Sequence, residues 1–270
     1  MKARLIVLIS IVVFFSYSCE KLTAPFTDSP VIESYLSPGA TPLVKVSRQI
    51  PFAGNAVYSD DDINALAITI KKGNETHTMT PVGDGTYTDS SVIGEGDEFT
   101  LSFIYNLRKV LATTSIPAKP SNFTASDDNV SVVRMTEGAM PSMGSFGSME
   151  PLSLTWDNED ASYYIVVIEC VESEPDPVRD FSDSIPPMNM FRKRPTTSQG
   201  IEIRPQEFQY FGQHRIILFH VLPDYASLYD EKISSSQNLT NPSTSIANGY
   251  GIFTGLNSDT IYVQVNESAR

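Results

Sequence analysis

The sequence is poor in the residues that most catalytic, metal and nucleic-acid sites require. Its 270 residues include only 3 His and 2 Cys, so a closed zinc site of the Cys/His type would need nearly all of them in one place. Lys and Arg total 19 against 32 Asp and Glu, and the formal net charge of -13 argues against binding to nucleic-acid phosphates. The sequence contains no G-x-S-x-G, H-E-x-x-H or P-loop motif. We therefore expect a protein that is not an enzyme, holds no metal or other cofactor and binds no nucleic acid.

The N-terminal segment has the layout of a signal peptide. Lys2 and Arg4 give it a basic start, and Leu5–Phe15 is apolar apart from Ser10. This apolar run is too short to span a bilayer as a helix, which distinguishes it from a transmembrane anchor. Removal of residues 1–18 would take both cations with it and leave a mature chain with a net charge of -15.

Cys19 lies where bacterial lipoproteins are cleaved and acylated. Ser16-Tyr17-Ser18-Cys19 resembles a lipobox, although Leu or Val is usual where Ser16 stands, and the same Ser-x-Ser also suits an ordinary signal peptidase. We interpret residues 1–18 as a lipoprotein signal peptide, Cys19 as the lipidation site and residues 19–30 as a tether. Each buried acyl methylene contributes about 0.8 kcal/mol, so a di- or triacylated Cys19 would anchor the chain to a membrane.

The remainder of the chain is predicted to form β-strands. Long runs with helical periodicity are absent, while short alternating runs lie between Gly, Pro, Asn and Asp clusters. Phe99–Tyr105 is the clearest run, and Leu152–Trp156 directs the single Trp inward. Gly83-Asp84-Gly85 predicts a hairpin turn between Thr76–Thr80 and Thr86–Thr88. The other expected strands are Val31–Leu36, Leu43–Ser47, Ala65–Lys71, Lys109–Thr114, Tyr163–Cys170, Ile201–Arg204, Arg215–Leu222 and Thr260–Val265.

A domain boundary is expected at Ile116–Pro120, where two prolines three residues apart stiffen the chain. After it, a Pro-rich segment, Leu154-Thr155-Trp156 and Tyr163–Val167 follow in an order that resembles a fibronectin type III domain. The predicted fold class is all-β, with two antiparallel β-sandwich domains of the immunoglobulin or fibronectin III kind. The expected domains are residues 31–116 and residues 117–270, the second with long loop insertions at 136–150 and 172–200.

Several short motifs along the mature chain resemble a known family. They are Val31–Gly39, Val44–Arg48, Thr114–Pro117 and Asn248–Phe253, in that order. In order and spacing they are similar to a Bacteroidota outer-membrane lipoprotein family of unknown function, domain-of-unknown-function family 4249, over nearly the whole mature chain. The resemblance implies an outer-membrane, lipid-anchored protein that assists a TonB-dependent receptor or nutrient-uptake system without catalysis. It supplies no catalytic residues, and Glu20-Lys21 after Cys19 leaves the cell surface and the periplasmic face both open.

The best candidate for a partner-binding surface lies in the second expected insertion. Methionine is concentrated between residues 135 and 190, and a basic run follows in a chain that is otherwise acidic. Thioether side chains repack easily against varied partners, whereas copper binding would require His or Cys beside them. We expect the contact residues to be Met188, Met190, Phe191, Arg192, Lys193 and Arg194, unless this segment is only a solvated loop.

Two alternatives to the accessory role remain open. A direct glycan- or peptide-binding surface protein would need an aromatic groove, whose most plausible lining is Tyr210, Phe211, Tyr225 and Tyr229. An enzyme would need two carboxylates that converge from distant positions. His214 and His220 would lie about 20 Å apart in one strand, too far to share a metal ion. Asp60–Asp62 and Asp157–Asp160 lack the pattern of an EF-hand, and Cys170 is expected to be a buried apolar residue.

Overall fold

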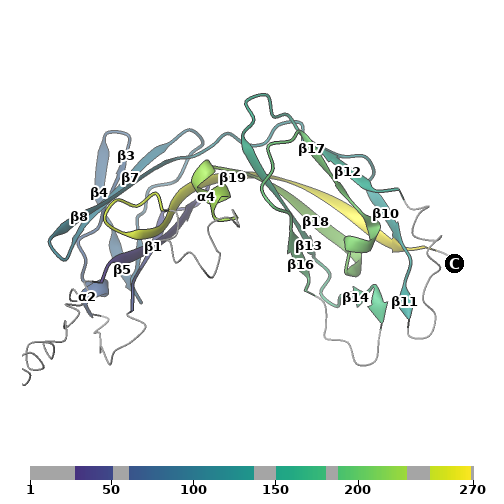
Figure 1. The fold of residues 1–270 in the computed structure, drawn as a ribbon, viewed down its shortest axis with the longest axis horizontal. Helices are drawn as coiled ribbons and strands as arrows, with labels where there is room; N and C mark the ends of the chain where they lie inside the picture. The colour runs from purple at the N-terminus through teal and green to yellow at the C-terminus, as the bar shows by residue number, and fades with distance from the viewer. Residues whose placement is uncertain (1–27, 51–60, 137–149, 181–187, 230–243, 269–270) are drawn as a thin grey trace, which may run out of the picture. The chain divides into compact units, whose positions relative to one another are not determined.

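The computed structural model describes residues 28–50, 61–136, 150–180, 188–229 and 244–268. They form a nearly all-β structure with several antiparallel sheets, which confirms the predicted all-β sandwich fold (Figure 1). The helices within this part of the chain are short: α2 (Asp61–Asn64), α4 (Pro223–Ser227) and the single 3-10 turn η1 (Pro205–Glu207).

The first sandwich consists of two sheets. One sheet contains β1 (Pro30–Leu36), β2 (Leu43–Arg48), β6 (Thr86–Thr88) and β5 (Thr80–Gly83), in that spatial order. The other contains β4 (Glu75–Thr78), β3 (Thr69–Lys72), β7 (Glu98–Tyr105) and β8 (Arg108–Ser115).

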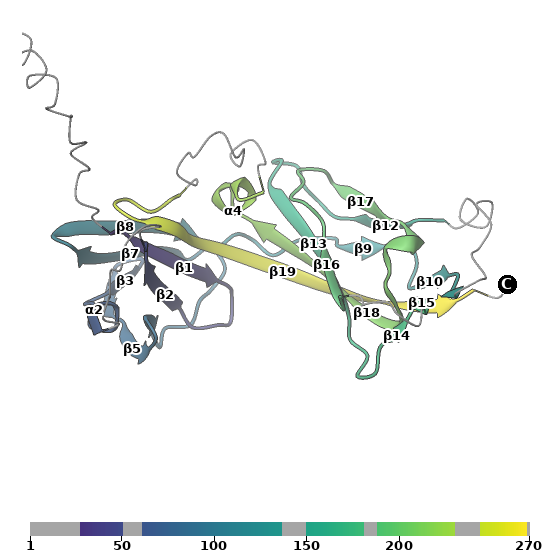
Figure 2. The same ribbon diagram turned by 60° about the horizontal axis from the view of Figure 1, so that its bottom comes forward.

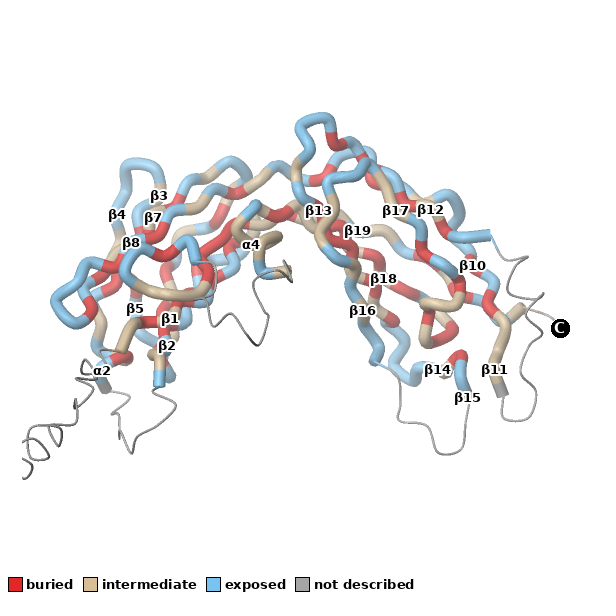
Figure 3. The backbone as a smooth tube through the Cα atoms, in the orientation of Figure 1, coloured by how far each residue is buried: buried red, intermediate tan, exposed pale blue. Residues whose placement is uncertain are grey.

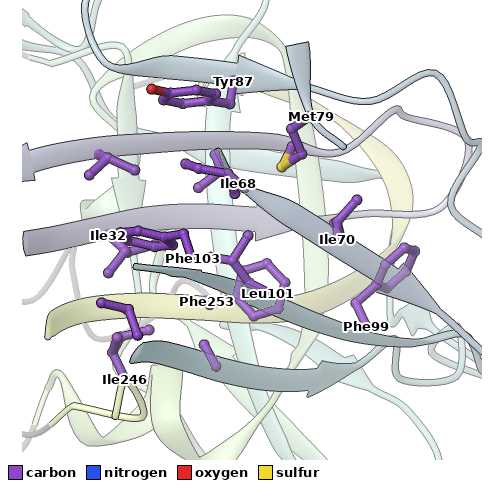
Figure 4. Packing of buried hydrophobic residues seen from close by; sticks show 14 of the residues in the cluster. Ile32, Ile68, Ile70, Met79, Tyr87, Phe99, Leu101, Phe103, Ile246 and Phe253 are labelled. Atoms are coloured by element: carbon purple, nitrogen blue, oxygen red, sulfur yellow. The ribbon is translucent and has the colours of Figure 1, made fainter. Parts of the chain in front are cut away.

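Strict alternation along the strands builds the core of this sandwich. Phe99, Leu101, Phe103 and Tyr105 of β7 are buried, as the sequence predicts, while the residues between them lie toward solvent (Figure 3). Figure 4 shows Phe99, Leu101 and Phe103 packed with side chains from both sheets, among them Tyr87. The Tyr87 hydroxyl donates to the Ile63 carbonyl and accepts from the Leu66 N–H, so a buried polar atom is fully satisfied.

Two of the three hairpins with two-residue turns in this sandwich differ in the residues that form the turn. The turn between β5 and β6 contains Asp84 at φ 50° and Gly85 at φ 67°. A Cβ on Gly85 would lie 2.1 Å from the Val46 carbonyl oxygen, and its N–H donates to Asn64 Oδ1 at 2.7 Å. The turn between β7 and β8 contains Asn106 at φ 46° and Leu107 at φ 62°. Both turns therefore have the two positive φ angles of a type I′ hairpin, but only the first has the expected Gly.

The second sandwich also has two main sheets. One is the continuation of the sheet that contains β1, and the two parts together form a single ten-stranded sheet. This part contains β16 (Met190–Arg192), β13 (Tyr163–Cys170), β18 (Tyr210–Val221) and β19 (Tyr250–Glu267), with β10 (Asn129–Val132) and β14 (Asp176–Pro177) paired to β19 and β18. The other contains β17 (Gly200–Ile203), β12 (Leu152–Thr155) and β9 (Thr124–Ala125). A separate pair is formed by β11 (Met135–Thr136) and β15 (Arg179–Asp180).

The core of the second sandwich surrounds the single tryptophan. Trp156 is buried, and its ring contacts Phe123 and Tyr164 with centroid distances of 6.4 Å and 5.7 Å. Cys170 at the end of β13 is buried and carries a free thiol, and burial raises the pKa of that thiol. These placements agree with the inward Trp and the buried Cys expected from alternation.

Strand β19 is much longer than the predicted Thr260–Val265. It runs parallel to β1 over Tyr250–Gly255 and antiparallel to β18 over Leu256–Val265, so one strand belongs to both sandwiches (Figure 2). Phe253 is buried in the first core and Val265 in the second. The domain boundary at residue 117 stays a prediction. A boundary there assigns all of β19 to the second domain, although Tyr250–Gly255 pairs with β1 of the first sandwich.

Other differences from the predicted strands are local. The predicted strand Ala65–Lys71 begins only at Thr69, because the preceding residues form α2 and a turn in which Ile68 is buried. The predicted insertion 172–200 contains three short strands in its described part, and 137–149 of the other insertion lies outside the described residues.

Candidate functional site

A tyrosine-lined groove lies on the outer face of the sheet formed by β13, β16 and β18. Alternation sends Val166, Ile168, Ile216 and Leu218 into the second core. Their neighbours in sequence point to the other face, where the groove is lined by Ile165, Val167, Glu169, Arg215, Ile217, Phe219 and Val221. An outer sheet face with this many apolar residues is unusual, since the exposed face of an antiparallel sheet is normally polar.

Helix α4 and Tyr229, the second residue after its end, form the second wall of the groove. Pro223 at the first turn suits a helix start, because its missing N–H needs no partner there. Tyr225 and Tyr229 line the groove, and Tyr35 of β1 completes a chain of three rings. The centroids lie 5.8 Å apart for Tyr35 and Tyr225, and 6.0 Å apart for Tyr225 and Tyr229. The groove has a volume of about 400 Å³, which is within the range of small-ligand sites.

Charged groups stand at the rim of this groove. Arg192 Nη1 donates to the Tyr229 hydroxyl at 3.1 Å, and this bond raises the pKa of Arg192 above its ordinary value. Arg215 and Glu169 form an ion pair at 2.5 Å. Burial, together with the interactions with Tyr229 and Tyr35, raises the pKa of Tyr225 to about 12. The Tyr225 phenol therefore stays neutral at pH 7, and the groove combines apolar walls with a few oriented donors and acceptors.

The structure separates the six residues predicted to contact a partner. Met190 and Arg192 line the groove. Phe191 points to the opposite face and packs on Phe208, with ring centroids 6.4 Å apart. Lys193 forms an ion pair with Glu207, away from the groove. Met188, with 77% of its surface exposed, and Arg194, also exposed, are not among the lining residues.

The aromatic lining expected for a ligand-binding groove is also divided. Tyr225 and Tyr229 line the groove, whereas Tyr210 and Phe211 are buried, Phe211 within the second core. Sequence reasoning missed Tyr35, although alternation along β1 places it outward between the buried Ser34 and Leu36. Nothing in the sequence indicates that this strand lies beside α4.

The histidines and acidic loops have structural partners. His214 is buried, and burial lowers its pKa, while its Nδ1 lies 3.1 Å from the Gly212 carbonyl. Nδ1 of His220 lies 2.8 Å from the Ala118 carbonyl, and His77 lies 3.1 Å from Asp89. Asn158 donates to the Ser162 and Thr197 carbonyls, so it closes the bend of its acidic loop. Within the described ranges, no cluster of three or more His, Cys, Asp or Glu could hold a metal ion.

A larger hollow of about 1000 Å³ lies on the other side of β16. Its lining includes the ion-paired Lys193 and Glu207, and Met135 and Pro151 form part of its edge. Residues 137–149, which connect those two edge residues in the chain, lie outside the described residues. The tyrosine-lined groove is the better defined of the two.

Comparison with models of known protein families and a search of the curated proteins both find no match for this chain. In the part of the chain that the structure describes, no helix has the length and apolar character needed to cross a membrane.

Proposed function

We propose that the protein is a lipid-anchored, non-enzymatic binding component of an outer-membrane nutrient-uptake system, and that the tyrosine-lined groove is its contact surface for a TonB-dependent receptor. The proposal combines the lipobox-like segment ending at Cys19, the family resemblance of the mature chain and the groove. The observation that carries it is the groove, because an apolar sheet face held open beside three tyrosines and Arg192 has the composition of a contact surface.

The composition of the groove suits a protein partner. Tyrosine and arginine are enriched among the residues that dominate binding energy at protein interfaces, and both types line this groove. The Arg192–Tyr229 hydrogen bond holds one such pair in a fixed geometry before any partner arrives. Contact residues from strands and a helix are also more rigid than residues of a free loop.

Co-purification from outer membranes tests the partner. The tagged full-length protein is expected to recover a TonB-dependent receptor, and Arg192→Ala should lower that recovery at least several-fold. Lys71→Ala serves as the matched control, because Lys71 is an exposed cation on β3 outside the groove. Failure to recover a receptor, or equal recovery with both variants, would refute the proposal.

Palmitate labelling tests the anchor separately. The wild-type protein is expected to incorporate the label and Cys19→Ala to lose it, since the thiol of Cys19 is the proposed attachment point. Label that persists in Cys19→Ala would contradict the anchor without affecting the groove.

A second candidate function is direct recognition of a glycan or peptide in the same groove. The three tyrosine rings favour it, because aromatic side chains supply apolar contact area together with a polar hydroxyl. Binding of the purified protein to a glycan or peptide array, lost in Tyr229→Ala and kept in Lys71→Ala, would support this candidate over the receptor.

A further inference from the structure

The tip of the β7–β8 hairpin presents a bulky apolar side chain in an unfavourable backbone conformation. Leu107 has φ 62° and 98% of its surface exposed. A residue with a branched side chain is disfavoured in this left-handed region, where Gly or Asn is usual. No packing within the described residues compensates for this, since almost nothing covers the side chain. Backbone strain that the packing of the fold does not explain indicates that this residue contacts something outside the chain.

The residues next to Leu107 give the tip an amphipathic character. Ile104, with 59% of its surface exposed, pairs across the hairpin with Lys109, and Arg108 follows the turn directly. The segment from Ile104 to Leu111 carries two cations and no carboxylate, in a chain with a net charge of -13. Neither Arg108 nor Lys109 takes part in an ion pair with any described residue. Apolar side chains flanked by cations suit the interface of an anionic lipid bilayer.

The part of β8 next to the hairpin tip lies close to the point where the tether joins the fold. Asn248 Nδ2 donates to the Lys109 carbonyl at 2.8 Å, and Leu111 and Ala247 exchange backbone hydrogen bonds. Two residues beyond Asn248, Tyr250 pairs with Val31 at the start of β1. Pro30 therefore enters the first sandwich beside the strand that leads to the cationic tip.

The tether limits how far this end of the sandwich can lie from an anchored Cys19. Cys19 and Pro30 are eleven positions apart, and an extended chain spans at most about 3.6 Å per residue. The start of β1 would thus stay within about 40 Å of the lipid. A single exposed Leu and two cations bind a membrane weakly by themselves, but an anchor that keeps them near the surface raises their effective concentration.

We propose that the β7–β8 hairpin tip, formed by Ile104, Leu107, Arg108 and Lys109, docks onto an anionic phospholipid surface as a second membrane contact. This inference rests on the proposed lipid anchor, which brings the tip within reach. It implies that the anchored protein holds a defined orientation on the membrane instead of swinging freely on its tether.

The test places a fluorophore at the tip of the lipidated full-length protein. Leu107→Cys carries an environment-sensitive dye, and Val82→Cys is the matched control, because Val82 is 58% exposed on the other hairpin. The proteins are reconstituted with vesicles of phosphatidylethanolamine and phosphatidylglycerol that contain a doxyl-labelled quencher lipid. We expect quenching several-fold stronger at position 107 than at position 82. Arg108→Gln with Lys109→Gln, or replacement of phosphatidylglycerol by phosphatidylcholine, should reduce the quenching at position 107 to the control value.

Flotation of the vesicles distinguishes a failure of the hairpin contact from a failure of the lipid anchor. Protein that floats with vesicles but shows equal quenching at positions 107 and 82 would overturn the hairpin contact and leave the anchor intact. Protein that does not float would overturn both. A dye at position 107 that becomes shielded only when a purified receptor is added would assign the tip to a protein contact and refute the membrane contact.

Discussion

Two hairpins of the first sandwich, β5–β6 and β7–β8, form turns with the same backbone geometry from different residues. The β5–β6 turn uses Asp84-Gly85, and its backbone is packed so closely against Val46 that only Gly fits. The β7–β8 turn uses Asn106-Leu107 with similar positive φ angles, and Leu107 lies almost wholly in solvent. The first turn is therefore explained by the fold, whereas the second keeps a cost that the fold does not require. This difference is the reason why we propose a contact at the second turn and not at the first.

The largest effect is expected for Gly85→Ala. The added methyl would meet the Val46 carbonyl oxygen at 2.1 Å, and the hydrogen bonds that Gly85 makes to Asn64 and Val46 would be disturbed. We expect the free energy of unfolding to fall by about 3 kcal/mol, measured by urea denaturation. A loss below about 0.5 kcal/mol would mean that this turn is no more constrained than the other.

Asp89→Asn tests the residues that secure the end of the β5–β6 hairpin. Burial raises the pKa of Asp89, but hydrogen bonds from Ser91 and His77 outweigh it and hold the pKa below its ordinary value. The stabilisation is complete above the unfolded-state pKa of about 3.9 and is lost as the pH falls through the lower folded-state pKa. The variant should lose about 1.5 kcal/mol at pH 7.

The free energy of unfolding, measured as a function of pH, tests how much the ionised Asp89 side chain contributes to stability. The gap in unfolding free energy between Asp89→Asn and the wild type should narrow as the pH drops below about 4. A gap of constant size from pH 7 to pH 2 would show that the ionised form of Asp89 contributes nothing.

Leu107→Gly should raise the free energy of unfolding, whereas the two preceding substitutions should lower it. Relief of a left-handed Leu is worth about 1–2 kcal/mol, and the extra freedom of Gly in the unfolded chain offsets part of it. We expect a net gain of about 0.5–1 kcal/mol in the free energy of unfolding. A substitution that stabilises the fold while it weakens membrane contact would sharpen the contrast between the hairpins, whereas destabilisation would show that Leu107 has a structural role.

The smallest effect is expected for Val82→Ser on the β5–β6 hairpin. Val82 is exposed and lies outside the first core, so its replacement should change the free energy of unfolding by less than about 0.5 kcal/mol. A change in membrane binding as large as that of a Leu107 variant would remove the distinction between the two tips. The membrane contact is measured in the reconstituted lipidated protein as doxyl-lipid quenching of a dye on the hairpin that carries the variant, because the lipid anchor alone would keep either variant with the vesicles in flotation.

Strands with clean alternation could be predicted from the sequence to within one or two residues. Glu98–Tyr105 and Tyr163–Cys170 are examples, because each alternates or remains apolar between recognisable turn residues. The length of β19 could not be predicted. Gly255 and the polar residues that follow it are typical of a turn, yet they lie within β19. The strand requires Gly at position 255, because a Cβ there would lie 2.1 Å from the Ser115 carbonyl oxygen. Tertiary pairing on both sides overrides the weak local preference.

The tyrosine-lined groove was predictable only in fragments. The sequence predicts Arg192 as part of a partner-binding surface and Tyr229 as part of an aromatic ligand-binding groove. The structure joins the two side chains by a hydrogen bond. Tyr35 comes from the start of the chain, and its place beside Tyr225 depends on the pairing of β1 with β19. No local pattern carries information on a contact between residues so distant in sequence.

The shared strand β19 has a consequence for the order in which the protein is made. β1 precedes its parallel partner Tyr250–Gly255 by some two hundred residues in the chain. The sheet of the first sandwich can therefore be completed only after most of the second sandwich has been synthesised, and pairing between residues so distant in sequence slows folding. Folding of the two sandwiches is thus coupled through β19, because the sheets of both include this strand.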